Sequence, residues 1–150
     1  MTVEIEVAQE ADDDAVAAFN RLLPQLSTAS PILDGPTLSR MISHPASTVL
    51  FARVHGEIVG TLTLVMFPGP SGVRARIEDV VVDGAVRGQG VGTALAREAL
   101  RLASAAQART VDLTSRPSRS AANRLYERLG FQPRDTRAYR YTVDHSVRSR

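Results

Sequence analysis

The chain has 150 residues, a formal net charge of +2 at pH 7 and no cysteine. This length supports one compact domain with a buried core, and the lack of cysteine excludes disulfides, a thiolate nucleophile and a thiolate metal site. All 18 basic residues are arginine, so the sequence pI of about 9.6 reflects the high pKa of arginine more than a large positive charge. The arginines are interleaved with acidic residues and have no aromatic stripe beside them, which argues against nucleic-acid binding.

No run of 18 apolar residues occurs, which argues against a transmembrane helix and a membrane partner. Residues 1–6 alternate acidic and apolar side chains, unlike a signal peptide. The three histidines are far apart and lack metal-ligand spacing, so we expect no metal site. These features favour a cytoplasmic enzyme. The exclusive use of arginine is typical of a GC-rich genome, and we expect a bacterial protein.

The first part of the chain predicts one strand and two helices. Residues 3–7 alternate as in a strand. An acidic cluster should cap a helix over residues 12–23, with Pro24 ending it. A turn-rich loop over 27–35 then leads to a short helix over 36–43.

The middle of the chain predicts three consecutive strands. Residues 49–54 and 58–67 form two of them, joined by a hairpin at Gly56-Glu57. The proline- and glycine-rich loop 68–72 separates them from a further strand over 74–82.

The remaining sequence predicts a helix over about 91–105, a strand over 110–113 and a helix over about 120–129. A last antiparallel pair is expected between Phe131 and Val143. We expect a single domain over 1–143 and a polar, disordered tail over 144–150.

The most informative segment runs from Val80-Val81-Val82 through Arg87 and three alternate glycines into an apolar helix. This order predicts a strand, a glycine-rich turn and a helix. The first amides of a helix have no partner within it, and with the helix dipole they bind anions, phosphate above all. Glycine leaves the backbone open to phosphate oxygens. We therefore predict a phosphorylated cofactor at this turn.

Two other interpretations of the turn stay open. A dinucleotide fingerprint, G-x-G-x-x-G, begins at Gly88 but requires glycine at position 93, which is threonine; Asp112 lies near its acidic position. The other interpretation is a glycine-rich turn that binds no ligand. The pattern that fits fully is R-x-x-G-x-G, formed by Arg87, Gly90 and Gly92.

This pattern resembles the acetyl-CoA pyrophosphate loop of the GNAT superfamily of N-acetyltransferases. The segment from Leu113 to Phe131 resembles the family's second motif, in which a polar loop leads to a helix ending in L-Y-x-x-x-G-F. The two motifs stand in the family's order and cover about half of the chain. The resemblance implies an α+β fold with a mostly antiparallel sheet of six to seven strands, splayed between strands 4 and 5, about four flanking helices and cofactor in the cleft.

The resemblance also implies acetyl-CoA as co-substrate and assigns a set of contacts to it. Backbone groups of the valine triplet would pair with the pantetheine arm, and the glycine-rich turn would hold the pyrophosphate. The expected cofactor-binding residues are Val80, Val81, Val82, Arg87, Gly88, Gln89, Gly90, Val91, Gly92, Thr93, Arg119 and Asn123.

Two of these residues depart from the family pattern. Arg119 stands where family members commonly carry a cofactor-contacting asparagine, and Asn123 stands where an aliphatic residue is usual. Arg119 either meets a CoA phosphate or is a solvated surface residue. Asn123 either reaches the pantetheine or is satisfied by backbone groups.

Three residues are candidates for proton transfer. Within its motif, Tyr126 is the candidate acid for the leaving thiolate. Glu78 and Asp79 precede the valine triplet, and strand alternation sends them to opposite faces. Ile77-Glu78-Asp79 also resembles the glucosamine-6-phosphate acetyltransferase branch. We favour Glu78 as the base, with Asp79 as its rival and a structural hydrogen bond as the alternative for both.

The expected function is acetyl transfer to a primary amine of a small molecule, directly and without a covalent intermediate. Protein N-terminal or lysine acetylation, and a non-catalytic acetyl-CoA-binding module, are the alternatives. A homodimer is left open.

Overall fold

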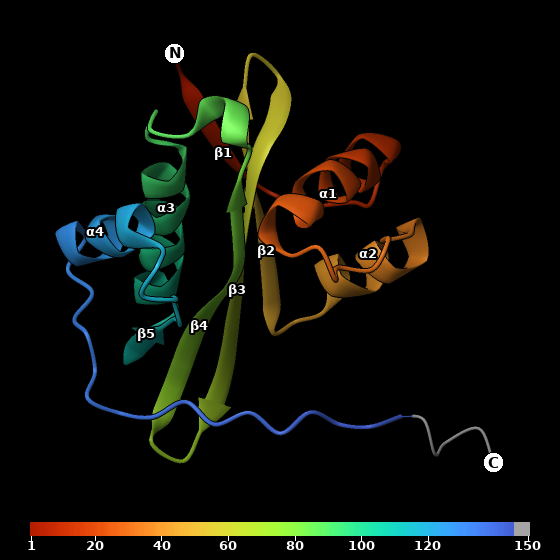
Figure 1. Ribbon diagram of the computed structural model, residues 1–150. Coiled ribbons are helices and arrows are strands. Elements are labelled where there is room, and N and C mark those ends of the chain that lie inside the picture. The colour runs from red at the N-terminus through yellow and green to blue at the C-terminus, as the bar shows by residue number, and fades with distance from the viewer. Residues whose placement is uncertain (146–150) are drawn as a thin grey trace.

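A five-stranded sheet with helices on both faces forms the body of the protein (Figure 1), seen in a computed structural model that describes residues 1–145. The strands lie in sequence order. The first four are antiparallel and the last pair is parallel. This mixed, mostly antiparallel arrangement confirms the predicted fold class. The strands are β1 (Val3–Val7), β2 (Ser47–Val54), β3 (Glu57–Gly69), β4 (Gly72–Val82) and β5 (Thr110–Asp112).

Four α-helices accompany the sheet in the described residues. Helices α1 (Asp13–Leu26) and α2 (Gly35–Ser43) cover one face. Helix α3 (Val91–Ala105) covers the other face, and α4 (Ser120–Arg128) lies beside α3 (Figure 1). No helix among residues 1–145 is long and apolar enough to span a membrane.

Each face of the sheet has its own core. Leu62, Leu64 and Ile77 turn toward α3 and pack with Leu95. On the other face, Phe51 packs with residues of α1 and α2, and its ring meets that of Phe19 edge to face at 5.6 Å. Alternating side chains of the same strands thus bind helices to both faces.

The end of α1 differs from the sequence expectation, because the helix continues to Leu26 with Pro24 inside it. A proline removes one backbone hydrogen bond and disfavours a helix interior. Here the last turn is still held, since the Ser27 amide donates to the Leu23 carbonyl at 3.0 Å. Leu23 and Leu26 also pack against the core beneath α1. The expectation that Pro24 ends the helix was wrong because it omitted this packing.

A β-bulge interrupts β4 just before the valine triplet. Thr63 pairs with Glu78 and Thr61 pairs with Val81, so two residues of β4 oppose one of β3. Asp79 occupies the bulge with a φ of 51°, a left-handed conformation that aspartate tolerates better than most residues. The bulge reverses the alternation of β4. Ile77 packs toward α3 before it, whereas Val81 packs toward α1 and α2 after it.

Strand β5 pairs over its whole length, but only with the first half of β4. The parallel ladder runs from Arg74–Thr110 to Arg76–Asp112 and stops there. The remainder of β4, residues 77–82, has β3 on one side, and no strand of the described residues pairs with it on the other. The sheet therefore opens between the fourth and fifth strands, as expected.

The last antiparallel pair expected between Phe131 and Val143 is absent from the described residues. No residue from 132 to 143 joins a strand ladder, and Figure 1 shows this segment leaving α4 as an extended chain. The sheet described here accordingly has five strands and not six to seven. A strand needs a partner edge, and this segment pairs with none of the strands among the described residues. The tail expected over 144–150 lies, from residue 146 on, outside the described residues.

Candidate active site

The glycine-rich turn ends in the uncapped N-terminus of α3. Gly90 is the N-cap residue in a left-handed conformation, with a φ of 86°, and no side chain in the described part of the chain caps this end. The first backbone bond into the helix runs from the Ala94 amide to the Gly90 carbonyl at 3.0 Å. The amides of Val91, Gly92 and Thr93 precede that bond, so they lack the usual helical partners. This end of α3 is suited to an anion.

Gly92 has a packing role as well. A Cβ atom added there would lie 3.3 Å from Leu125 Cδ1 and 3.8 Å from Val82 Cγ2. Leu125 belongs to α4, so the missing side chain lets α4 approach the first turn of α3. This contact brings the second sequence motif against the first.

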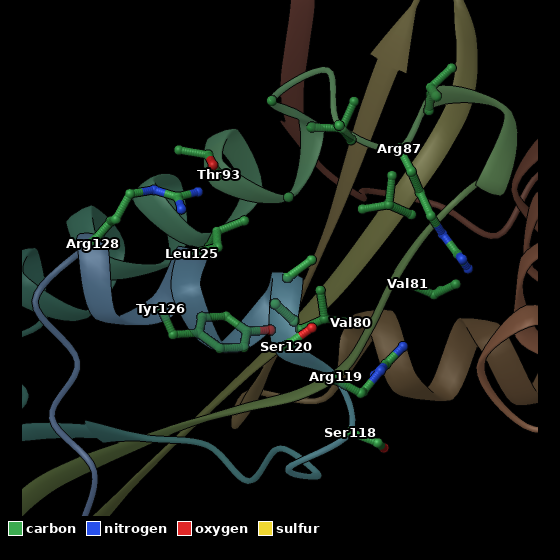
Figure 2. A pocket seen from close by; sticks show the side chains of 18 residues that line it. Val80, Val81, Arg87, Thr93, Ser118, Arg119, Ser120, Leu125, Tyr126 and Arg128 are labelled. Atoms are coloured by element: carbon green, nitrogen blue, oxygen red, sulfur yellow. The ribbon is translucent and has the colours of Figure 1, made fainter.

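A pocket of about 650 Å³ lies where β4, the turn, α3 and α4 meet (Figure 2). Its volume falls in the range of about 300 to 1,000 Å³ typical of small-molecule sites. The lining residues are Val80, Val81, Val82, Val86, Arg87, Gly88, Gly90, Val91, Gly92, Thr93, Ser118, Arg119, Ser120, Ala121, Ala122, Leu125, Tyr126 and Arg128.

The pocket is cationic. Arg87, Arg119 and Arg128 line it, and no acidic residue is among the described residues that do so. Within residues 1–145, none of the three arginines forms an ion pair. Figure 2 shows Arg87 and Arg119 on one side of the pocket and Arg128 on the side of Thr93. Three unpaired guanidinium groups beside a helix N-terminus favour a ligand with several phosphate groups.

Tyr126 enters the pocket from α4, with its hydroxyl directed inward (Figure 2). Its ring meets that of Phe131 edge to face at 5.6 Å, and its carbonyl accepts the Phe131 amide at 3.0 Å. Burial raises the pKa of the Tyr126 phenol, and the positive charge of Arg119 opposes that rise. The phenol therefore stays protonated at neutral pH and can donate a proton.

The valine triplet borders the pocket with an open backbone edge. On the sheet side, Val81 pairs with Thr61 and Val82 with Gly60. Within residues 1–145, the opposite edge of these valines pairs with no strand, because the β5 ladder has already ended. All three valines line the pocket. An extended ligand chain can pair with such an edge as an added strand would.

The two candidate bases lie before the triplet, outside the residues that line the pocket. The Glu78 carboxylate accepts a hydrogen bond from Arg76 Nε at 2.9 Å. It follows Ile77, which packs toward α3, so alternation turns Glu78 to the α1–α2 face. Asp79 lies in the bulge. Withdrawal from water raises the pKa of Asp79, and the negative charge of Glu78 adds to the rise.

Two expected cofactor residues lie apart from the pocket lining, Gln89 and Asn123. Asn123 Nδ2 instead donates to the Arg116 carbonyl at 3.1 Å, which holds the loop before α4. The sequence left two roles open for Asn123, a contact with the pantetheine and a hydrogen bond to the backbone. The structure shows the hydrogen bond to the backbone.

Other lining residues were not singled out from the sequence: Val86, Ser118, Ser120, Ala121, Ala122, Leu125 and Arg128. A signal for part of this set was present. Ala121, Leu125 and Arg128 follow a spacing of four and three residues, which places them on one face of a helix.

Comparison with known proteins places this geometry in a family. A family model described as "Acetyltransferase (GNAT) family" matches residues 8–131. An acetyltransferase of Trypanosoma brucei is 28% identical with a TM-score of 0.78, and the match covers 95% of this chain and 100% of that one. A provisionally named acetyltransferase of Agrobacterium tumefaciens is 27% identical with a TM-score of 0.82, covering 93% and 99%.

A third structure has the same fold at lower identity. It is an aminoglycoside acetyltransferase from an uncultured soil metagenomic sample, 20% identical with a TM-score of 0.84, and the match covers 95% of this chain and 97% of that one. No curated protein matches the sequence.

Proposed function

Because the chain belongs to the GNAT family of acetyltransferases, we propose that it moves the acetyl group of acetyl-CoA to a primary amine of a small molecule. Transfer is direct, within a ternary complex. The observation that carries the proposal is the cationic pocket between the open edge of β4 and the uncapped start of α3.

The residues present fit acetyl-CoA. Its pyrophosphate needs several donors at close range, and the amides from Gly90 to Thr93 supply them without an intervening side chain at Gly90 or Gly92. Arg87, Arg119 and Arg128 add positive charge around the same space. Acetyl-CoA supplies an activated acetyl group when bound, and the chain's own residues bind, orient and exchange protons with the reactants.

The open edge of Val80, Val81 and Val82 aligns the pantetheine arm by backbone hydrogen bonds. An amide of this edge also polarises the thioester carbonyl, which stabilises the charge that develops on its oxygen. This role uses the main chain, so it is compatible with the packing of the valine side chains against the two cores.

Tyr126 donates the proton that the leaving thiolate needs. Its hydroxyl lies in the pocket, and its raised pKa keeps the proton in place until a strong base forms beside it. The Tyr126 ring packs against Phe131, so the hydroxyl is already oriented before the reaction begins.

The amine must be neutral to attack, whereas a free primary amine with a pKa near that of lysine, about 10.4, is protonated at pH 7. Glu78 removes this proton, directly or through water, from the α1–α2 face of β4. Arg76 orients its carboxylate. Asp79, one residue closer to the triplet, is the rival for this role.

An amine screen tests the proposal. Purified protein is mixed with acetyl-CoA and a panel of small amines, aminoglycosides, and peptides with free N-termini or lysines, and thiol release is followed with a chromogenic disulfide. The chain has no cysteine, so the protein adds no thiol signal. Small amines should release CoA thiol. Turnover confined to peptides would move the assignment to protein acetylation, and CoA binding without any turnover would leave a binding module.

A further inference from the structure

The β3–β4 hairpin extends beyond the first two strands of the sheet. β2 begins at Ser47, opposite Val65, so beyond this pair β3 continues with β4 on one side and no described strand on the other. Figure 1 shows this end of the hairpin projecting past α1 and α2. Leu64, Ala75 and Ile77 turn toward α3. The residues that alternate with them therefore face the α1–α2 side, where the helices leave them open.

Five side chains form an open shelf on the α1–α2 side of the hairpin. Val65 pairs with Arg76 and Phe67 with Arg74, and Glu78 follows Arg76 on the same face of β4. Phe67 is 43% exposed, and the side chains of Arg76 and Glu78 are 39% and 44% exposed. The shelf thus combines an apolar floor with a pair of opposite charges that solvent can reach.

Arg76 uses only part of its hydrogen-bonding capacity within the protein. Its Nε donates to the Glu78 carboxylate at 2.9 Å. Within residues 1–145, its two terminal nitrogens have no hydrogen-bond or ion-pair partner. A guanidinium is a planar fork, and its outer edge can bind a carboxylate through two parallel hydrogen bonds. The neighbouring Arg74 instead donates through Nη2 to Ser71 Oγ at 3.0 Å. Arg76 therefore presents a free edge for an anion directly beside the proposed base.

On the basis of the proposed acetyl transfer with Glu78 as base, we infer that Arg76 binds a carboxylate of the acceptor, so that the acceptor is a zwitterionic amino acid. Its ammonium lies at Glu78 and its carboxylate at Arg76. The two side chains together have no net charge, which complements a zwitterion better than an amine with a phosphate or a second ammonium. Residues two apart on a strand are about 7 Å apart, so about three or four methylene groups should separate the two ends of the acceptor. Val65 and Phe67 contact these methylene groups.

Acceptors that differ only in charge test the carboxylate. γ-Aminobutyrate and δ-aminovalerate are compared with their uncharged amides, and thiol release from acetyl-CoA is followed. We expect kcat/KM to be at least about 10-fold higher for the acids, because only they gain charge-assisted hydrogen bonds to Arg76. Equal turnover of acids and amides would overturn the inference and leave the proposed function standing. A preference for aminopropyl phosphate over the acids would also overturn it. If no amine in the wider screen is acetylated, the proposed function itself fails.

Three substitutions test Arg76 itself, and the readout is the ratio of kcat/KM for acid and amide. This ratio cancels any effect of Arg76 on Glu78, because both acceptors need the same base. Arg76→Gln should bring the ratio close to one. Arg76→Lys keeps the charge but loses the fork, so it should keep only part of the preference, and it decides the question if Arg76→Gln is too slow to measure. The matched control Arg74→Gln should leave the ratio unchanged. A ratio that survives both Arg76 substitutions, or that is lost in Arg74→Gln instead, contradicts the inference.

Discussion

At the scale of single residues, Tyr126 combines the two properties required of a proton donor in this pocket. Its hydroxyl faces the space where the cofactor would lie, and burial raises its pKa. The same ring packs against Phe131, so a substitution must separate chemistry from packing.

Tyr126→Phe makes that separation, because it keeps the ring and removes the hydroxyl. We expect kcat to fall about 100-fold or more, the usual scale for a lost general acid, with little change in the KM for acetyl-CoA. Steady-state kinetics on an amine found in the screen measure both. Tyr139→Phe, an exposed tyrosine outside the pocket, is the control and should keep full activity. A Tyr126→Phe protein with undiminished kcat would show that the tyrosine only packs.

The two carboxylates before the triplet can be distinguished by their pH profiles. Glu78→Gln should lower kcat/KM at pH 7 and lose less at high pH, where more of the amine is already neutral. Asp79→Asn should keep most of the activity. If Asp79→Asn inactivates a well-folded protein while Glu78→Gln has no effect, Asp79 is the base and the amine approaches from the bulge.

Asp79 also predicts a dependence of stability on pH. Its pKa is raised in the folded protein, so the folded state binds the proton more tightly than the unfolded state does. Its contribution is fully present below the unfolded pKa of about 3.9 and is lost as the pH rises through the raised folded value. Asp79→Asn stays neutral and tolerates the left-handed conformation of the bulge. We expect it to unfold at higher denaturant concentration than the parent at pH 7, with the gain vanishing near pH 3. A constant gain across this range would exclude the titration of Asp79 as its cause.

At the scale of elements, α3 connects the fold with binding. Its apolar face is buried against the sheet through Leu95, Ala96 and Ala99, and its N-terminus opens into the pocket. Glycine is required at positions 90 and 92 for different reasons. Gly90 adopts a left-handed conformation with open space around it, whereas Gly92 makes room for Leu125 of α4.

A pair of substitutions at Gly90 tests the anion site. Gly90→Asp places a negative charge where the pyrophosphate should lie, and calorimetry should detect no CoA binding. Gly90→Asn has nearly the same size and is equally tolerant of the left-handed conformation, so it controls for shape and backbone strain. We expect the asparagine variant to bind with a loss of no more than about 10-fold, roughly 1.4 kcal/mol. Equal binding by the aspartate variant and the parent would sink the assignment of this turn to the cofactor.

At the scale of the whole molecule, the pocket links elements that are separate in the second half of the sequence. Strand β4, helix α3 and helix α4 all contribute residues to its wall. A ligand that bridges these elements binds only the folded state. Its binding energy is therefore added to the stability of the entire domain.

Acetyl-CoA at 100 times its Kd should stabilise the fold by about 2.7 kcal/mol. At roughly 2 to 4 °C per kcal/mol for a chain of this size, the Tm should rise by about 5 to 10 °C. Differential scanning fluorimetry measures the shift, and Gly90→Asp should show none. A shift of the same size in Gly90→Asp would mean that the ligand stabilises the protein from another site.

Some features of this protein follow from short stretches of sequence. The caps at Asp12 and Asp34, the turn before α3 and the glycine after α4 depend on a few neighbouring residues, because caps and glycine conformations are local. The two motifs were therefore enough to predict the family, the fold class and most residues of the pocket wall.

Other features required the tertiary structure, because they depend on partners distant in sequence. The bulge at Asp79 exists only in register with β3, and it reverses the alternation that the sequence alone predicts. The packing of Gly92 depends on Leu125, and the side chain of Asn123 is directed by the Arg116 carbonyl. The pattern of residues 131–143 predicts a strand, but whether a strand forms is decided by the edge it meets. Local sequence thus determined which elements can form and where an anion can bind, while strand register and edge pairing decided how those elements meet.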